Sequence, residues 1–250
     1  TGLHAMTLAT RHAICSIVTC LLFVSPVPAA DTPQPAWVRV TEKAGWTARD
    51  SQGELVYKNR LWLFGGWMNS FEAPPRDVWS SADGKKWTQV TAKAPWIHSD
   101  LSMSLTFKNR MFLLGGWNPA NKRQFPMVCN NEGWSSVTGK DWVLVKKNTH
   151  LDRQFDRNSD WEGRHTAGYV VYRNKMWLVG GDANQGHYQS DIWNSADGRT
   201  WKQVNHGLPA TWSPRVLHHT VVFQDKIWVM GGPVSYTHLR AHETLRYRVC

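Results

Sequence analysis

Short apolar runs separated by polar turn residues recur along this chain. The four clearest segments end in a glycine pair and read YKNRLWLFGG (57–66), FKNRMFLLGG (107–116), YRNKMWLVGG (172–181) and FQDKIWVMGG (223–232). Each joins two strand-length apolar runs through a polar turn. No segment sustains the 3.6-residue apolar period of an amphipathic helix. The pattern therefore predicts an all-β fold with almost no helix.

The glycine pairs also set the length of a repeat. They end at residues 66, 116, 181 and 232, so two steps are close to 50 residues and one is 65. Repeats of this length are typical of β-propeller arrays. In the first unit we expect four strands over 51–57, 61–64, 77–81 and 87–91, with turns at 58–60 and at Asp83-Gly84. Fourth strands align on a Trp-x-x-Val motif that begins at Trp37, Trp87, Trp142 and Trp201, and we expect these Trp to pack between sheets.

These features together resemble the Kelch repeat, which has an Arg before its first strand, a Gly-Gly after its second, and spaced aromatic residues that end in a Trp. The Arg positions are occupied by Arg49, Ser99, Arg164 and Arg215, so the second unit departs from the pattern. The resemblance covers residues 37–232 and implies a Kelch-type β-propeller. The chain would hold about three full four-stranded blades plus part of a fourth. Trp37-x-x-Val40 has no earlier strands of its own, and such a strand is expected to act as a clasp for a last blade.

Both ends of the chain are left out of this predicted fold. Residues 1–30 have the order of a secretory signal peptide, with Arg11, an apolar run over 13–24 and small residues over 26–30, and residues 1–5 read as upstream read-through. The apolar run is shorter than the roughly 20 residues of a membrane span. Residues 233–250 have no counterpart in the repeats and contain VSYTHLRAHET, which resembles a translated sequencing adapter. We therefore expect a non-native tail, a longer natural protein, and a secreted or periplasmic location without a transmembrane span after signal removal.

Charge and cysteine content change once these ends are set aside. The whole chain has a net charge of +10, but the part between the ends keeps 25 basic and 18 acidic residues, about +7. The basic residues are scattered among turns rather than gathered in a stripe, which argues against nucleic acid as a partner. Cys129 is the one cysteine between the ends, so this part forms no internal disulfide. A many-stranded exported protein has a core large enough to fold without one.

Two sets of loops carry the residues that suit a ligand. We call the loops before each first strand the leading loops and those after each second strand the trailing loops, and in propellers of this family both open on the face that usually binds ligands. The candidate ligand-binding residues are Trp46, Arg49, Trp67, Trp96, Trp117, Trp161, Arg164, Asp182, Trp212 and Arg215. Trp rings cover the apolar face of a sugar while charged groups bond its hydroxyls. Arg also binds a carboxylate in a bidentate manner, although the alternative for the repeated Arg is a brace between blades.

The sequence offers few catalytic groups. His98 and His165 lie in leading loops and are candidates for an acid or base. His218 and His219 are adjacent on a predicted strand, so their side chains face opposite ways, which disfavours a metal pair. We predict no metal or other cofactor.

Two functions therefore remain open. The first is a binding scaffold for a polar small molecule, a glycan or a protein, favoured by the repeated Trp and Arg loops. The alternative is a carbohydrate-active enzyme of the sialic acid mutarotase or galactose oxidase type. The oxidase type needs a Tyr linked to Cys beside copper, and Cys129 has no Tyr near it in sequence. A cytoplasmic adaptor, as other Kelch proteins are, conflicts with the signal peptide.

Overall fold

The computed structural model describes residues 36–68, 73–118, 120, 129–183, 186–205, 212–234 and, for the backbone, 246–249. The chain divides into two units, residues 1–38 and residues 39–250, and the second unit holds all the sheets. The predicted signal peptide lies outside the described residues. None of the described segments forms a helix with the length and apolarity that a membrane crossing requires.

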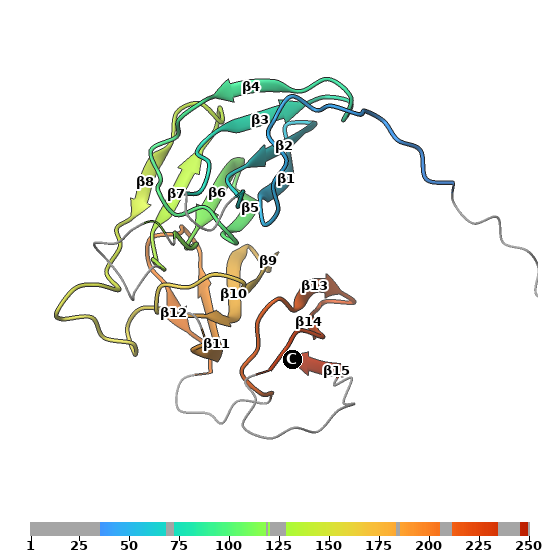
Figure 1. Cartoon of the computed structure of the whole chain (residues 1–250). Helices are drawn as coiled ribbons and strands as arrows, with labels where there is room; N and C mark the ends of the chain where they lie inside the picture. The colour runs from blue at the N-terminus through green and yellow to red at the C-terminus, as the bar shows by residue number, and fades with distance from the viewer. Residues whose placement is uncertain are drawn as a thin grey trace, which may run out of the picture. The chain divides into compact units, whose positions relative to one another are not determined.

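The described part is all-β and consists of antiparallel blade-like sheets, as the apolar pattern predicts (Figure 1). The first sheet holds β1 (Gly53–Tyr57), β2 (Arg60–Phe64), β3 (Val78–Ser81) and β4 (Thr88–Thr91). The second holds β5 (Met103–Phe107), β6 (Arg110–Leu114), β7 (Gly133–Ser136) and β8 (Val143–Lys146). The third holds β9 (Gly168–Tyr172), β10 (Lys175–Asp182), β11 (Tyr188–Ser195) and β12 (Lys202–Gln203). The fourth holds β13 (His219–Phe223), β14 (Lys226–Met230) and β15 (Arg246–Val249).

The order of the sheets follows the order of the chain. First strands of consecutive sheets contact one another in the sequence β1, β5, β9, β13 (Figure 1). The described sheets form an open series rather than a closed ring. Three full sheets and one incomplete sheet agree with the blade count expected from the repeats.

Tight turns set the register between first and second strands. Lys58 and Asn59 have φ values of 48° and 56°, and the three equivalent pairs behave alike. Two consecutive residues with positive φ define the two-residue hairpin turn that suits the right-handed twist of paired strands, and Asn or Asp tolerates this conformation well. The turn makes Tyr57 pair with Arg60 and Gly53 pair with Phe64.

The glycine pairs are required by close approach of two sheets. A Cβ on Gly115 would lie 2.6 Å from the carbonyl oxygen of Arg164 in the next leading loop, and Gly115 itself has a φ of 62°. Gly116 has a φ of 111° and donates its N–H to the same Arg164 carbonyl at 2.9 Å. Both positions therefore exclude a side chain, on steric and on conformational grounds.

The core lies between neighbouring sheets. Trp142 of the second sheet packs against Phe64 of the first, with ring centroids 5.5 Å apart, in a buried cluster that includes Trp62 and Leu113. A second cluster joins the second and third sheets around Phe112, Met176 and Trp201. These contacts confirm that the fourth-strand Trp is a packing residue, because burying an aromatic ring of this size contributes several kcal/mol at about 25 cal/mol per Å².

Two expectations at the ends differ from the structure. Trp37 is fully exposed and residues 37–40 form no strand, because this motif lacks the three preceding strands that position its counterparts. Residues 233–250 were left out of the predicted fold as a non-native tail, and β15 within this segment pairs in antiparallel fashion with β14, from Ile227 opposite Val249 to Met230 opposite Arg246. The edge of β14 presents backbone groups that need partners, and an extended segment supplies them.

Candidate functional site

The Trp residues of the leading loops are core residues, which corrects their prediction as ligand platforms. Trp96, Trp161 and Trp212 are 1%, 0% and 4% exposed. Trp96 lies edge-on to Trp142 at 4.4 Å, and Trp161 lies edge-on to Trp201 at 5.8 Å. Trp96 and Trp161 thus cover the fourth-strand Trp of their own sheets, and Trp212 packs in a buried cluster with Val179, Ile192 and Val229.

Trp46 belongs to the same packing scheme, although it is only half-buried. Its ring lies edge-on to Trp87 at 4.3 Å and to Trp79 at 6.3 Å. Because these partners occupy its ring, Trp46 is a packing residue of the first sheet rather than an open aromatic platform.

Arg49 and Arg164 are braces, the alternative that the sequence left open. Arg164 is fully buried and binds both carboxylate oxygens of Asp191 at 2.5 and 3.0 Å. It also donates to the carbonyl oxygens of Gly180 and Glu162 at 3.0 and 2.9 Å. Arg49 makes the same bidentate contact with Asp77. Burial raises the pKa of Asp191, but the charge and hydrogen bonds of Arg164 outweigh it and hold that pKa below its ordinary value.

The other two Arg positions vary this arrangement. Arg215 is 3% exposed and donates to the carbonyl oxygens of Gly231 and Ser213 at 2.7 and 3.3 Å. Ser99 replaces the Arg in the second sheet, and its hydroxyl donates to the Pro75 carbonyl at 3.0 Å. The guanidinium groups of Arg49, Arg164 and Arg215 therefore bind backbone and carboxylate groups inside the protein.

A ring of strained backbone joins the four sheets where their leading loops meet their first strands. We call Ser51, Leu101, Thr166 and Leu217 the inner ring; their φ values are 57°, 49°, 56° and 50°. The N–H of Leu101 donates to the Ser51 carbonyl at 3.1 Å, Thr166 to Leu101 at 3.1 Å, and Leu217 to Thr166 at 3.0 Å. A non-glycine residue in this conformation costs about 1–3 kcal/mol, and such residues gather at functional sites.

A cavity of about 340 Å³ opens at the inner ring, and we call it the inner cavity. All four inner-ring residues line it, and the remaining lining residues are Gln52, Glu54, Ser102, Ala167, Tyr169, His218 and His219. Each of the four sheets contributes lining residues, so the cavity forms only when the sheets pack together. Most of the lining residues carry polar side chains, which offer hydrogen-bonding groups to a hydroxyl-rich ligand.

Three of the four residues directly before the inner ring are polar. Asp50, Asp100 and His165 precede Ser51, Leu101 and Thr166 in the chain. Asp100 is 2% exposed, and its Oδ1 has no hydrogen-bond partner among the described residues. Burial first, and then the charge of Asp50, raise the pKa of Asp100 to about 7. A carboxyl group that titrates near neutral pH is suited to proton exchange.

Trp67 and Trp117 of the trailing loops pair through their backbones with Asp50 and Asp100. The N–H of Trp67 donates to the Asp50 carbonyl at 2.8 Å, and the N–H of Trp117 donates to the Asp100 carbonyl at 2.9 Å. Both rings are only partly buried, yet their indole Nε1 atoms are shielded and have no partner among the described residues. Buried polar atoms in folded proteins normally have partners, so two shielded indole donors without one are unusual.

His165 and Asp182 complete this side of the site. The backbones of His165 and Asp182 exchange hydrogen bonds of 3.0 and 2.9 Å, and the His165 ring lies 5.9 Å from the Trp117 ring. Burial lowers the pKa of His165, although the Asp182 carboxylate, 3.9 Å away, opposes this change. The same carboxylate accepts N–H groups from Gly186 and His187, so it also orders the β10–β11 loop.

Burial controls the charge of the other titratable groups in the inner cavity. His218 is 7% exposed, and burial, with the charge of Arg215 next, lowers its pKa to about 4, so the ring is neutral at pH 7. Burial raises the pKa of Tyr169 and of the partly exposed Glu54. Only His218 of the histidine pair is buried, as expected from their opposite facing, although both line the cavity.

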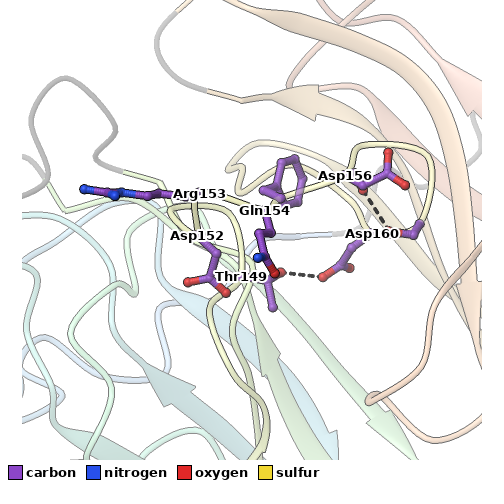
Figure 2. A pocket seen from close by; sticks show the side chains of 8 residues that line it. Thr149, Asp152, Arg153, Gln154, Asp156 and Asp160 are labelled. Carbon is purple, nitrogen blue, oxygen red and sulfur yellow. Dashed lines mark hydrogen bonds between the residues drawn. The ribbon is translucent and has the colours of Figure 1, made fainter.

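A second cavity of about 500 Å³ lies within the connection between β8 and β9 (Figure 2). Its lining residues are Thr149, Asp152, Arg153, Gln154, Phe155, Asp156, Ser159 and Asp160. Asp160 accepts a hydrogen bond of 2.5 Å from Thr149 and an ion pair of 2.7 Å from Lys146. One connection supplies this whole lining, and its most buried carboxylate is already paired, so the inner cavity is the better candidate.

From the predicted set, Trp67, Trp117 and Asp182 each pair through the backbone with a leading-loop residue, namely Asp50, Asp100 and His165. The structure adds Asp50, Asp100 and the inner cavity, which were not predicted as site residues. Their signal was a polar residue recurring directly after the Arg position in the first three repeats. Across the described residues, no group of three or more His, Cys, Asp or Glu is placed to hold a metal ion. In comparisons with known proteins, no family profile and no curated protein matches this chain.

Proposed function

We propose that this chain is an exported Kelch-type propeller protein that binds a polar small molecule or a glycan at the inner cavity and the Trp67–Trp117 side of its rim. Kelch membership rests on the repeated glycine pairs, the Arg braces and the Trp positions. Export rests on the signal-like sequence over residues 1–30. A protein ligand is the less favoured occupant, because a small polar cavity suits a small molecule.

One observation carries the binding proposal: shielded polar atoms without partners gather around the inner cavity. Gln52 lines the cavity, Asp100 and His165 directly precede inner-ring residues in the chain, and Trp117 pairs with Asp100; each has at least one such atom within the described residues. A sugar supplies hydroxyl groups that both donate and accept, so it matches a mixed set of carboxylate, amide and indole groups. The two partly open Trp rings provide apolar area for the ring carbons.

A mutarotase-type activity is the second candidate, favoured by Asp100 alone. A carboxyl group with a pKa of about 7 is present in both protonation states at neutral pH, and interconversion of sugar anomers needs a proton to be given at one oxygen and taken at another. The sialic acid variant of this candidate loses its support, because the braced Arg49 and Arg164 do not offer a site for a sugar carboxylate.

Nuclear magnetic resonance of the full chain tests the binding proposal directly. Indole N–H signals of Trp67 and Trp117, assigned with Trp67→Phe and Trp117→Phe, should shift on titration with glucose, galactose or N-acetylglucosamine. The signal of Trp228, whose Nε1 donates to the Phe223 carbonyl at 2.9 Å away from this site, is the internal control. Binding that moves the Trp228 signal but neither of the other two would overturn the assignment.

Anomer exchange in the same samples separates the two candidate functions. A mutarotase should increase the exchange rate between the anomeric signals of the sugar, and Asp100→Asn should remove that increase while the indole shifts persist. Binding without faster exchange supports the scaffold alone.

A further inference from the structure

We infer that two copies of this chain associate head to tail, with the fourth sheet of each copy packed against the first sheet of the other. In each sheet, we call the side towards the following sheet the forward face and the side towards the preceding sheet the back face. The described sheets form an open series, so the forward face of the fourth sheet and the back face of the first sheet have no neighbouring sheet among the described residues. The inference concerns these two faces and goes beyond the proposed function.

The forward face of the fourth sheet exposes apolar side chains that the other sheets bury. Phe64, Leu114 and Val179 directly precede the first three glycine pairs, and each is at most 1% exposed because it packs in a cluster with the following sheet. Met230 holds this position in the fourth sheet and is 39% exposed. Phe223 on the same face is 58% exposed. The fourth sheet therefore carries a packing face of the usual kind without its cover.

The back face of the first sheet shows the same difference. Met111, Met176 and Ile227 hold one repeat position in the three later sheets and are 0%, 0% and 4% exposed. Leu61 holds this position in the first sheet and is 40% exposed, and Val56, which pairs with it, is 64% exposed. Exposed apolar side chains that are contiguous on a protein surface mark an interaction site.

An unfilled apolar cavity on the back face of the first sheet shows where a partner side chain fits. It has a volume of about 230 Å³, and its lining residues are Glu54, Leu55, Val56, Leu61, Trp62, Leu63 and Trp87. On the second sheet, Trp62 and Phe64 of the preceding sheet fill the equivalent place. The fourth sheet carries Trp228 and Met230 at the same two repeat positions. It therefore holds the side chains that fill such a cavity.

The turn between third and fourth strands leaves room for the Trp228 ring. A Cβ on Gly139, in this turn of the second sheet, would overlap the Trp62 ring of the preceding sheet. Near the equivalent Gly84 of the first sheet, the one described atom within 4 Å of such a Cβ, apart from its chain neighbours, is Leu61 Cδ1 at 3.5 Å. The ring of Trp228, the counterpart of Trp62, would therefore lie on Gly84 of the second copy.

Backbone hydrogen bonds also match between the two faces. In the inner ring, the Leu101 N–H donates to Ser51, and the series ends where the Leu217 N–H donates to Thr166. The Ser51 N–H and the Leu217 carbonyl have no bond of this kind among the described residues. Head-to-tail packing would bring the Ser51 N–H of one copy to the Leu217 carbonyl of the other, so the same bond would continue across the contact.

A pair of polar side chains is complementary as well. Gly53 on the forward face of the first sheet lies opposite Ser104, because a Cβ on Gly53 would be 3.2 Å from the Ser104 Cβ. His219 holds the Gly53 position in the fourth sheet, and Glu54 holds the Ser104 position in the first sheet. The contact therefore places an imidazole opposite a carboxylate, and the two groups can form a hydrogen bond.

Two copies suffice to close a ring. A head-to-tail contact is heterologous, so it produces a ring when the rotation closes and a filament when it does not. The four sheets of each copy give eight in total, and closed propellers contain up to about eight blades. We therefore expect a dimer in which both copies have both faces covered.

Sedimentation velocity of the full chain measures this association. We expect a dimer over about two decades of protein concentration, without larger species. A chain that stays monomeric would overturn the inference and leave the two faces to further repeats of a longer natural protein. A mass that keeps rising with concentration would overturn the closed dimer.

Complementary variants test which faces meet. Met230→Glu places a charge on the forward face of the fourth sheet, and Leu61→Glu places one on the back face of the first sheet. Each variant alone should sediment as a monomer, because every contact needs both faces intact. An equimolar mixture should form a dimer, since the first sheet of Met230→Glu fits the fourth sheet of Leu61→Glu. Nonspecific adhesion gives no such recovery, so a mixture that stays monomeric would overturn the inference.

Val143→Glu is the matched control. Val143 is 53% exposed but lies on the second sheet, whose two faces already pack against neighbouring sheets. This variant should remain a dimer, and its dissociation would refute the assignment of the contact to the two open faces. Far-UV circular dichroism checks that each variant is folded. Phe223→Glu and Val56→Glu, at the more exposed positions of the same two faces, form a second pair for the mixing experiment.

Discussion

Replacing Arg164 by Met measures what the buried braces contribute to stability. Methionine keeps most of the aliphatic length of the side chain but removes the charge and every hydrogen bond. Asp191 would then be a buried carboxylate whose side chain is 17% exposed, without its bidentate partner, and the Gly180 and Glu162 carbonyls would lose their donor. Breaking a buried ion pair on one side costs about 3–5 kcal/mol.

The exposed pair of Arg173 and Asp225 is the matched control. Its shortest contact is also 2.5 Å, but the two side chains are 66% and 69% exposed. Water and salt screen such a pair, so Arg173→Met should remain close to the wild type in stability. Distance is the same in both pairs, and burial is the variable that differs.

Urea denaturation followed by tryptophan fluorescence supplies the comparison. With a slope of about 2–3 kcal/mol per M, the loss expected for Arg164→Met lowers the midpoint by about 1–2 M at pH 7. The pKa of Asp191 is depressed in the fold, so the contribution of the pair is present above the ordinary value of 3.8 and is lost as pH falls through the lower folded value. The difference in urea midpoint between Arg164→Met and the wild type should therefore become smaller at low pH.

A third variant separates charge from packing. Arg164→Met combined with Asp191→Asn removes the unpaired charge and keeps an acceptor for the indole N–H of Trp193, which bonds to Asp191 at 2.7 Å. Part of the lost stability should return. Equal losses for Arg164→Met and Arg173→Met, or no recovery in the double variant, would refute the argument that the buried pair braces the sheet.

Three further perturbations test other parts of the structure. Asp100→Asn should become more stable relative to the wild type as pH rises from about 4 to 8, by up to about 4 kcal/mol. The reason is that burial raises the pKa of Asp100 in the folded protein from 3.8 to about 7, whereas the amide never ionises. Thermal melts at several pH values measure this, and a difference in melting temperature that stays constant with pH would contradict it. Trp117→Ala should weaken ligand binding with little change in melting temperature, whereas Trp161→Ala should cost about 3–5 kcal/mol of stability because Trp161 is fully buried. Calorimetry that shows a large loss of stability for Trp117→Ala and a small one for Trp161→Ala would refute this assignment of Trp117 to the site and Trp161 to the core. Gly198→Ala should destabilise by at least about 1 kcal/mol in urea, because the glycine has a φ of 79° and a Cβ would lie 2.9 Å from the Phe112 ring; a midpoint equal to that of the wild type would refute this.

Local geometry could be predicted well from the sequence because nearby residues determine it. The Lys58-Asn59 turn and the strand over residues 61–64 follow from turn chemistry and apolar runs, and the structure places β2 at Arg60–Phe64. The Asp197-Gly198 turn is also found, held by bonds from the Asp197 and Gly198 N–H groups to Ser195 Oγ. It is longer than a two-residue turn, because the last paired residues on its two sides are Asn194 and Lys202.

Whether a loop side chain points into the core or towards solvent depends on residues far along the chain, so local sequence could not predict it. Trp161 and Trp117 both follow loop-like sequence beside polar residues, yet Trp161 is buried against Trp201 and Trp117 is partly open. Asp100 becomes unusual because the fold buries its carboxyl group and also brings Asp50, fifty positions earlier, near it. Repeats align such residues in the sequence, but only assembled sheets show which of them share one cavity.

The inner ring has a consequence for how a repeated protein recognises an irregular ligand. Backbone atoms make its hydrogen bonds, so the ring has the same geometry whatever side chain each position carries. The four positions hold Ser, Leu, Thr and Leu, and the positions before them hold Asp, Asp, His and Val. The backbone geometry of the inner ring thus repeats from sheet to sheet, but the side chains at and before its four positions differ. A ligand at the proposed site would therefore have one preferred orientation rather than four equivalent ones. Substitutions at these positions would alter the choice of ligand while leaving the geometry of the frame intact.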